Sequence, residues 1–326
     1  MSVALSAGTD GTFDLTGKSV WVAGGHGMVG SAVVRRLNRE PISRVITATS
    51  AQVDLRRQEQ TEEFVWEQRP DVAILAAARV GGIQANRSAQ ADFLYDNLMI
   101  NANALNACRL AGVQKVVVLG SSCIYPRSAP QPIREEYFLT GRLESTNEGY
   151  AIAKIAALEL GMMYRRQYGL DVISLMPTNI YGPGDNYDLE TSHVFPALIR
   201  KTYEAKMNGA ARVTLWGTGK ARREFLHADD LADAVIFCLI NYSADLHLNI
   251  GVGRDISILE LAHLMAETIG WEGEYVFDDS VPDGTLRKML NVGRLTELGW
   301  KGSISLRDGV ARSFQDYSAT LNTGSE

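Results

Sequence analysis

The sequence predicts an α/β protein with a doubly wound parallel sheet and a smaller C-terminal α/β domain. Three observations lead to this fold class. Strand-like apolar runs alternate with helical patterns, the run 72–77 is apolar on both faces, and a glycine-rich turn follows the first run. Strands buried on both faces belong to parallel sheets that helices cover on each side. Alternating strands and helices indicate βαβ units.

Each element follows from the local pattern. We expect strands at 20–23, 44–49, 72–77, 115–119 and 172–176, with helices at 28–37, 61–68, 92–111 and 150–168. Beyond Pro177 the segment 179–186 is rich in Gly, Pro and Asn and is typical of a loop. Later helices are expected at 196–206, 231–240 and 258–269, and strands at 213–216 and 248–250, the last returning to the main sheet. We therefore divide the chain into a leader (1–17), a first domain (18–178) and a second domain (179–326) with segments that return to the first.

Composition excludes several classes of protein. The 326 residues are 46% hydrophobic and carry a net charge of −6, so no overall basic field favours nucleic acid or a membrane surface. No apolar run reaches the roughly 18–20 residues that span a bilayer, and the first sixteen residues lack the apolar core of a signal peptide. Three scattered cysteines form neither a disulfide framework nor a metal-ligand spacing, which favours the reducing cytoplasm.

The glycine-rich turn spans residues 24–30, with Gly24, Gly27 and Gly30 in a G-x-x-G-x-x-G spacing between the first strand and the first helix. Glycines let backbone N–H groups approach a pyrophosphate, and the helix start adds a favourable dipole. We therefore expect a Rossmann-type dinucleotide site. The alternative is a glycine-rich turn that binds no ligand.

The region after the second strand indicates which dinucleotide binds. Enzymes that use NAD usually place an acid there to hold the ribose 2′-OH, yet residues 46–50 contain none. The first acid is Asp54, which is better placed for the adenine. A 2′-phosphate is not repelled, and His26, Arg35 or Arg36 is within reach of it, so we predict NADP(H).

Tyr150 and Lys154 stand four residues apart on a predicted helix and therefore share a face. An ammonium and the positive cofactor ring would lower the pKa of the phenol from its ordinary value near 10, so that Tyr150 exchanges a proton at neutral pH. The alternative is a surface tyrosine beside a solvated lysine. Ser121, Ser122 and Cys123 follow the strand 115–119, at the end where ligands bind in such sheets.

Several stretches resemble the GDP-L-fucose synthase family, within the extended short-chain dehydrogenases. They are residues 76–83, 120–126, 147–154, 176–183, 216–219, 223–227, 282–285 and 287–288. The resemblance covers roughly residues 18 to 310, and its stretches 120–126 and 76–83 are the most specific to the family. The family epimerises GDP-4-keto-6-deoxy-D-mannose at C3 and C5 and reduces its C4 ketone with NADPH.

The resemblance implies a role for each of a set of residues. Reduction would use Tyr150, Lys154 and Ser121, and epimerisation would use Cys123 and His193 as an acid/base pair. The cofactor would contact Gly24, Gly25, His26, Gly27, Met28, Val29, Gly30, Asp54, Leu55, Leu119, Gly120, Ser122, Lys154, Pro177, Thr178, Asn179, Ile180 and His193. The substrate would contact Lys201, Trp216, Arg223, Asp283 and Lys288. No metal is implied.

Elementary chemistry agrees with the implied epimerisation. A C4 ketone acidifies the hydrogens at C3 and C5, so one group must remove a proton and another must return one to the opposite face. Cysteine and histidine have pKa values near enough to neutral for this exchange. The chain departs from the family where His26 replaces a common Arg, where residues 48–50 lack a basic residue, and where Gly149 replaces a common Pro.

Other polar residues have a simpler interpretation. Basic clusters at 200–201, 222–223 and 287–288 are suited to a diphosphate or are solvated surface charges. Cys108 and Cys238 are expected in the core. We expect structural roles for His227, His247 and His263.

Two other kinds of function stay open. An NAD-dependent nucleotide-sugar 4-epimerase or a simple 4-keto reductase would keep Tyr150 and Lys154 without needing Cys123 and His193. A non-catalytic dinucleotide-sensing protein on the same fold could lose Tyr150 or Lys154, and this chain keeps both. The family resemblance and the long helices 92–111 and 150–168 suggest a homodimer.

Overall fold

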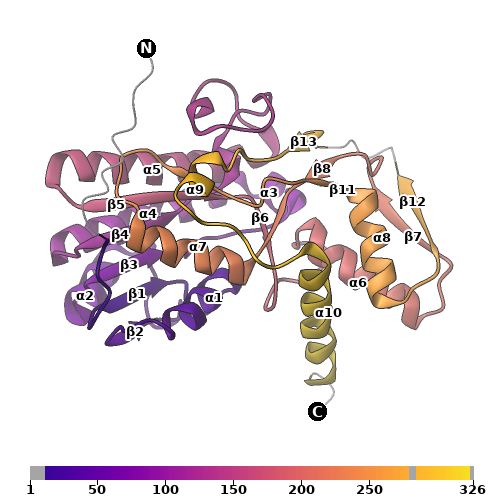
Figure 1. Cartoon of the computed structure of the whole chain (residues 1–326), viewed down its shortest axis with the longest axis horizontal. Helices are drawn as coiled ribbons and strands as arrows, with labels where there is room; N and C mark the ends of the chain where they lie inside the picture. Colours follow the sequence, from indigo (N-terminus) through magenta and orange to yellow (C-terminus); the bar gives the residue numbers. More distant parts are fainter. Residues whose placement is uncertain (1–11, 279–283, 324–326) are drawn as a thin grey trace.

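A six-stranded parallel sheet forms the centre of the computed structural model, which describes residues 12–278 and 284–323 (Figure 1). Its strands lie in the order β10-β5-β4-β3-β1-β2, and every neighbouring pair is parallel. They are β1 (Ser19–Ala23), β2 (Arg44–Ile46), β3 (Val72–Leu75), β4 (Lys115–Leu119), β5 (Asp171–Pro177) and β10 (Leu248–Ile250). The first domain therefore has the doubly wound parallel sheet that the sequence predicts.

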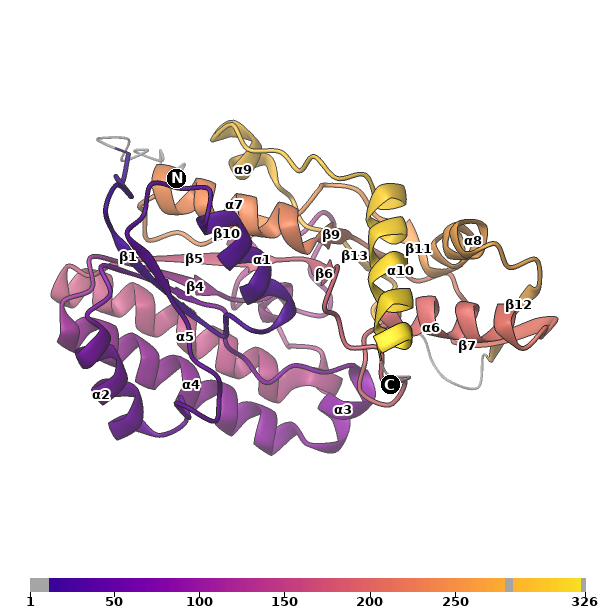
Figure 2. The ribbon, with the colours of Figure 1, turned by 90° about the horizontal axis from the view of Figure 1, so that it is seen from below.

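Helices cover both faces of this sheet (Figure 2). On one face lie α2 (Gln58–Gln68), α4 (Gln90–Ala111) and α5 (Glu148–Tyr168), and on the other lie α1 (Met28–Leu37) and α7 (Ala228–Asn241). Two apolar cores separate the layers: Leu105 and Val118 belong to the first core, and Val33 and Val235 to the second. β1, β3 and β4 are buried along their whole length, as expected of a sheet covered on both sides.

Part of the second half of the chain returns to this sheet. α7 packs beside α1, and β10 pairs with β5 in the register Leu248↔Leu175. This confirms the predicted return of residues 248–250. The two-stranded pair β6 (Asn179–Tyr181) and β9 (Phe225–His227) carries the chain out of the sheet and back.

The remaining elements form a smaller α/β body. α6 (Val194–Met207) packs on α8 (Ile258–Ile269) and on β7 (Arg212–Trp216), which forms a parallel pair with β12 (Glu274–Asp278). α10 (Leu306–Thr323) packs on α8 and β9. Three short strands, β8 (Arg222–Arg223), β11 (Ile256–Ser257) and β13 (Arg287–Lys288), form a separate sheet with β8 in the centre. Short elements complete the chain: α3 (Ile83–Ser88), α9 (Gly293–Glu297), and the 3-10 turns η1 (Ser122–Ile124), η2 (Glu135–Tyr137) and η3 (Ser145–Asn147).

Some expected element bounds were wrong. Residues 179–181 form β6, because Ile180 and Tyr181 are good strand formers that pair with Leu226 and His227; the glycines and prolines of that stretch come only afterwards. β2 ends at Ile46 and β3 at Leu75, so the residues after them belong to the loops at the carboxyl edge of the sheet.

The N-terminal region is described from residue 12 onward, so most of the predicted leader lies outside the described residues. Residues 12–17 lie against the fold: Leu15 is buried in the core, and the N–H of Phe13 donates to the carbonyl of Ile240 at 2.8 Å. In residues 12–278 and 284–323, no helix is both long and apolar enough to cross a bilayer.

Candidate active site

The glycine turn lies between β1 and α1 and requires glycine at two of its positions. Gly24 has a φ of +77°, and a Cβ there would lie 2.8 Å from the Cα of Ala77. At Gly30 a Cβ would lie 2.0 Å from the carbonyl oxygen of Gly24. The close packing of α1 on the turn, and of the turn on the end of β3, therefore excludes side chains.

The start of α1 suits an anion. None of the described side chains caps this helix, whose N-cap is Gly27, and its first turn contains no acid. The dipole of α1 and its first N–H groups favour a negative charge. A Cβ at Gly27 would have no neighbour closer than 3.6 Å, so the turn is open on this side. These residues therefore fit a dinucleotide pyrophosphate.

The basic residues expected near a 2′-phosphate are only partly available. Arg35 forms an ion pair with Asp229 at 2.7 Å, and Arg36 forms one with Asp233 at 2.8 Å. Both guanidiniums thus join α1 to α7. His26 stays exposed in the turn, where a Cβ on the neighbouring Gly25 would touch Thr47 beyond β2. Of the three predicted contacts, His26 is therefore the one placed beside the end of β2.

The other predicted cofactor residues follow the strands of the sheet. Gly120 and Ser122 follow β4, and Thr178 follows β5, so they share the carboxyl edge with the glycine turn. Asp54, beyond β2, accepts two bonds from the guanidinium of Arg56, from Nε at 2.8 Å and from Nη2 at 2.9 Å. The amide of Asn179 donates to the carbonyl of Glu224 at 2.8 Å. Leu119 and Pro177 are the last residues of β4 and β5, Ile180 lies in β6, and Leu55 lies in the loop between β2 and α2.

Tyr150 and Lys154 lie on one face of α5, as predicted. Lys154 is 2% exposed, its ammonium donates to the carbonyl of Leu119 at 2.8 Å, and it lies 5.8 Å from the centre of the Tyr150 ring. Burial lowers the pKa of Lys154 to about 8. The lysine therefore ties α5 to the end of β4.

The protein's own groups raise the pKa of Tyr150, whereas the expected lowering also depends on the positive ring of a bound cofactor. Burial raises it well above its usual value, the Cys123 charge adds to this rise, and a hydrogen bond with Ser121 opposes it. The protein's own groups thus keep the phenol protonated at neutral pH. A protonated Tyr150 is suited to donating a proton to an oxygen that gains negative charge.

Cys123 lies in η1, directly after β4. Its N–H donates to the hydroxyl of Ser121 at 3.2 Å, and its sulfur accepts from the amide of Asn147 at 3.1 Å and from the ammonium of Lys288 at 3.5 Å. Burial alone would raise the pKa of this thiol. The Lys288 charge and bonds involving Ser121, Lys288 and Asn147 outweigh it, so the net shift is downward. The sequence did not identify either contact to the sulfur.

The other cysteines are core residues. Cys108 and Cys238 are fully buried, and burial raises the pKa of both thiols, that of Cys238 to about 12. Two histidines also have structural contacts: His227 caps α7 by accepting from the N–H of Asp229, and His247 bonds to the hydroxyl of Tyr125 at 2.9 Å.

His193 is the N-cap residue of α6, but its side chain makes no capping bond to the described backbone. Solvent reaches the imidazole, yet the protein that surrounds it lowers its pKa by desolvation. The segment before it is fixed by Gly82, whose N–H donates to the carbonyl of Thr191 at 2.8 Å. α3, which begins after Gly82, packs on η3, the turn that contains Asn147. α3 and η3 therefore connect the segment before His193 to Asn147, the residue whose amide binds the sulfur of Cys123.

The predicted substrate residues fall into two groups. The ammonium of Lys201 lies 5.6 Å from the centre of the Trp216 ring, which is 62% exposed. Arg223 and Lys288 are direct partners in the pairing of β8 with β13. The fifth predicted residue, Asp283, lies outside the described residues.

In each basic cluster, one residue forms an ion pair within the protein and the other is directed elsewhere. The first residue of each pair binds an acid: Arg200 binds Glu204 at 2.7 Å, Arg222 binds Asp255 at 2.8 Å, and Arg287 also binds Asp255. The second residue does not point toward that acid. Lys201 donates to the carbonyl of Thr214, Arg223 donates to the carbonyl of Thr285 at 2.6 Å, and Lys288 reaches Cys123.

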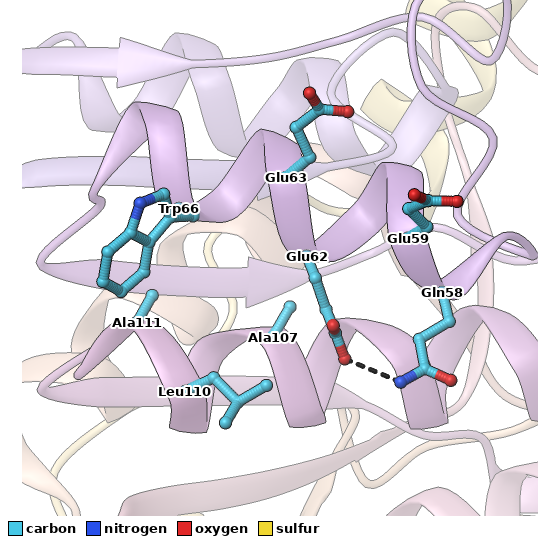
Figure 3. A pocket seen from close by; sticks show the side chains of 8 residues that line it. All are labelled: Gln58, Glu59, Glu62, Glu63, Trp66, Ala107, Leu110 and Ala111. Atoms are coloured by element: carbon cyan, nitrogen blue, oxygen red, sulfur yellow. Dashed lines mark hydrogen bonds between the residues drawn. The ribbon is translucent and has the colours of Figure 1, made fainter.

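A groove between α2 and α4 lies away from all of these residues. Figure 3 shows it with the half-exposed Trp66 at one end and acidic side chains along its rim. It is lined by Gln58, Glu59, Glu62, Glu63, Trp66, Ala107, Leu110 and Ala111, none of which is a predicted site residue. We therefore place the candidate active site at the carboxyl edge of the sheet.

Gly82→Ala is expected to impair the proton transfer predicted for His193. The backbone of Gly82 is extended, so the strain is steric: a Cβ would lie 2.3 Å from the carbonyl oxygen of Ser192. The segment before His193 must move, and misplacement by about 1 Å costs on the order of a hundredfold in rate. Exchange of substrate C–H hydrogens with deuterated water measures this loss. Ser88→Ala, exposed on the same helix, is the control; equal rates in the two variants would contradict a role for Gly82.

A parallel sheet with a glycine turn after its first strand and a Tyr–Lys pair beside its fourth is the architecture of a nicotinamide-dinucleotide-binding protein. The chain belongs to the NAD dependent epimerase/dehydratase family, whose sequence profile matches residues 20–251.

The similarity to individual relatives extends over nearly the whole chain. A protein of Sinorhizobium fredii (strain NBRC 101917 / NGR234) named GDP-L-fucose synthase is 51% identical, over 93% of this chain and 96% of the relative. A solved GDP-L-fucose synthetase from Naegleria fowleri bound to NADP has a TM-score of 0.90 at 29% identity, covering 98% of this chain and 99% of that one. A GDP-6-OMe-4-keto-L-xylo-heptose reductase from C. jejuni has a TM-score of 0.90 at 33% identity, covering 95% and 100%.

Proposed function

We propose that this chain is an NADP(H)-dependent enzyme that converts GDP-4-keto-6-deoxy-D-mannose to GDP-L-fucose. It epimerises the sugar at C3 and C5 and reduces the ketone at C4. One observation carries the proposal: Tyr150 and Lys154 on α5 lie beside the turn after β4, and that turn contains both Ser121 and the thiol of Cys123. The relatives named GDP-L-fucose synthase support the same substrate.

Reduction uses the residues around Tyr150. The cofactor, when bound, supplies the hydride that adds to C4 of the sugar. Tyr150 donates its phenolic proton to the C4 oxygen as that oxygen gains negative charge, and Ser121 hydrogen-bonds to the tyrosine and orients it. Lys154 holds a positive charge beside the ring and stabilises the phenolate that remains. A proton from solvent then restores the phenol.

Epimerisation uses Cys123 and His193. One group removes the hydrogen beside the ketone as a proton, the electron pair of the broken C–H bond moves toward the ketone oxygen, and the other group returns a proton to the opposite face. A thiol with a lowered pKa and an imidazole held near α3 have the chemistry for both transfers. Tyr150 is near enough to Ser121 to bond the same ketone oxygen during these steps.

The second domain binds the nucleotide part of the substrate. Lys201 and Arg223 supply positive charge for a diphosphate, and the exposed Trp216 offers an aromatic face beside Lys201. NADP(H) is the cofactor because residues 46–50, at the end of β2, contain no acid that would repel a 2′-phosphate, and the first turn of α1 contains none either. The relative from Naegleria fowleri, which was solved with NADP, supports this preference.

The proposal includes a homodimer in the cytoplasm. Large apolar side chains are exposed on the outer faces of α4 and α5, among them Tyr95, Leu98, Ile152 and Met163, and a second copy would cover them. All three cysteines are free, which suits a reducing compartment.

The test is an NADPH-oxidation assay with GDP-4-keto-6-deoxy-D-mannose, followed by NMR of the product sugar and repeated with NADH. We expect oxidation, an L-fuco product and faster turnover with NADPH. Oxidation with retained D configuration would leave a simple 4-keto reductase, and the roles of Cys123 and His193 would be wrong. No oxidation with either cofactor would exclude this substrate.

A further inference from the structure

Lys288 was expected to contact the substrate, but its ammonium points at Cys123. The distance from Nζ to the sulfur is 3.5 Å, and the amide of Asn147 donates to the same sulfur at 3.1 Å. The sulfur thus accepts one charged and one neutral hydrogen bond from two different elements, β13 and η3. Such bonds stabilise a thiolate far more than a thiol, because a neutral sulfur is a weak acceptor.

The other groups near Cys123 do not cancel this effect. Among the described residues, Tyr150 on α5 is a titratable group that interacts with the thiol, and burial keeps the phenol neutral at ordinary pH. Cys108 and Cys238 are an internal comparison: burial raises the pKa of both thiols, whereas the pKa of Cys123 is lowered. The charge of Lys288 is the largest of the effects that oppose burial at Cys123.

The backbone around Lys288 is fixed from several sides. Its strand partner is Arg223 in β8, and the neighbouring Arg287 binds Asp255. The next two N–H groups donate to buried or half-buried side chains: Met289 to Gln131 at 2.9 Å, and Leu290 to the fully buried carboxylate of Glu224 at 2.9 Å. The ammonium therefore reaches Cys123 from a rigid strand.

We propose that Lys288 acts as the electrostatic partner of Cys123, holding its sulfur as a thiolate so that the thiol can take part in proton exchange. This role rests on the proposed function, because it assumes that Cys123 exchanges a proton with the sugar. It differs from the substrate contact expected from the sequence. Because Lys288 acts through Cys123, its effect must appear in the ionisation of the thiol even when no substrate is present.

The experiment is the pH dependence of alkylation of Cys123 by iodoacetamide in the full chain, followed by mass spectrometry. Lys288→Met keeps the length of the side chain and removes its charge. In this variant we expect the midpoint of the curve of alkylation rate against pH to move upward by about one pH unit. Alkylation at neutral pH should then slow about tenfold. Lys288→Arg keeps the charge and should leave the midpoint near that of the unmodified chain.

The matched control is Arg287→Met, which removes a charge from the adjacent residue of the same strand, where the guanidinium binds Asp255. An unchanged midpoint in Lys288→Met would overturn the proposal, as would an equal shift in Arg287→Met. Alkylation of the buried Cys108 and Cys238 would show that the Lys288→Met protein is unfolded. In that case Lys288→Gln, which also removes the charge, is compared with Lys288→Arg instead. Since alkylation needs no substrate, failure of the proposed function would appear in the product assay and leave this result intact.

Discussion

Tyr150→Phe should lower turnover of the ketone by about 10²–10⁴, the range in which a general acid contributes to catalysis. The substitution removes one hydroxyl, the proton donor to the C4 oxygen in the proposed reaction. The ring of Tyr150 stays beside Lys154, so the packing of α5 is retained. NADPH oxidation with the keto sugar, measured at saturating substrate, gives the change in kcat.

Tyr164→Phe is the matched control. This residue lies on the same helix, and its hydroxyl donates to the side chain of Asn106 at 3.3 Å, away from the candidate active site. Its turnover should match that of the unmodified chain, and both variants should bind NADPH equally well. Near-normal turnover in Tyr150→Phe would show that another group supplies the proton.

The first domain was predictable because its signals are local. The runs 72–75 and 116–119 are continuously apolar, and the glycine turn requires no information beyond a few neighbouring residues. β6 was missed because its partner, β9, lies 46 residues later, at Phe225 for Asn179. A pairing between distant short strands leaves no periodicity in the sequence.

The candidate site was predictable as a set of residues but not as a set of contacts. Motifs identified Cys123 and Lys288 separately, and the two are 165 residues apart. The tertiary contacts of β13, among them its pairing with β8, bring the ammonium to the sulfur. In the same way, sequence could not show that Arg35 and Arg36 bind α7, because acids on another helix decide their direction.

The raised pKa of Tyr150 has the same origin. The sequence shows a lysine four residues away, which by itself would lower the pKa. It does not show that the surrounding protein desolvates both groups, and desolvation dominates here. The site is thus arranged to deliver a proton from a neutral phenol, which is what reduction of a ketone requires.

Cys123→Ser is expected to change the product rather than abolish reduction. A serine hydroxyl fits the same space and can still accept from the amide of Asn147, but it is not ionised at neutral pH and cannot serve as the proton-exchanging group. Epimerisation should fall by about 10²–10⁴, whereas Tyr150, Lys154 and Ser121 stay in place. NMR should therefore show a reduced sugar that keeps the D configuration.

Incorporation of solvent deuterium into the sugar measures epimerisation separately from reduction. In the unmodified chain, hydrogens at C3 and C5 should exchange with deuterated water; in Cys123→Ser that exchange should be lost while NADPH oxidation continues. Tyr150→Phe should show the opposite pattern, with exchange persisting and oxidation slow. A Cys123→Ser protein that forms GDP-L-fucose at the normal rate would remove the thiol from the chemistry, and the charge of Lys288 would then have to serve the substrate instead.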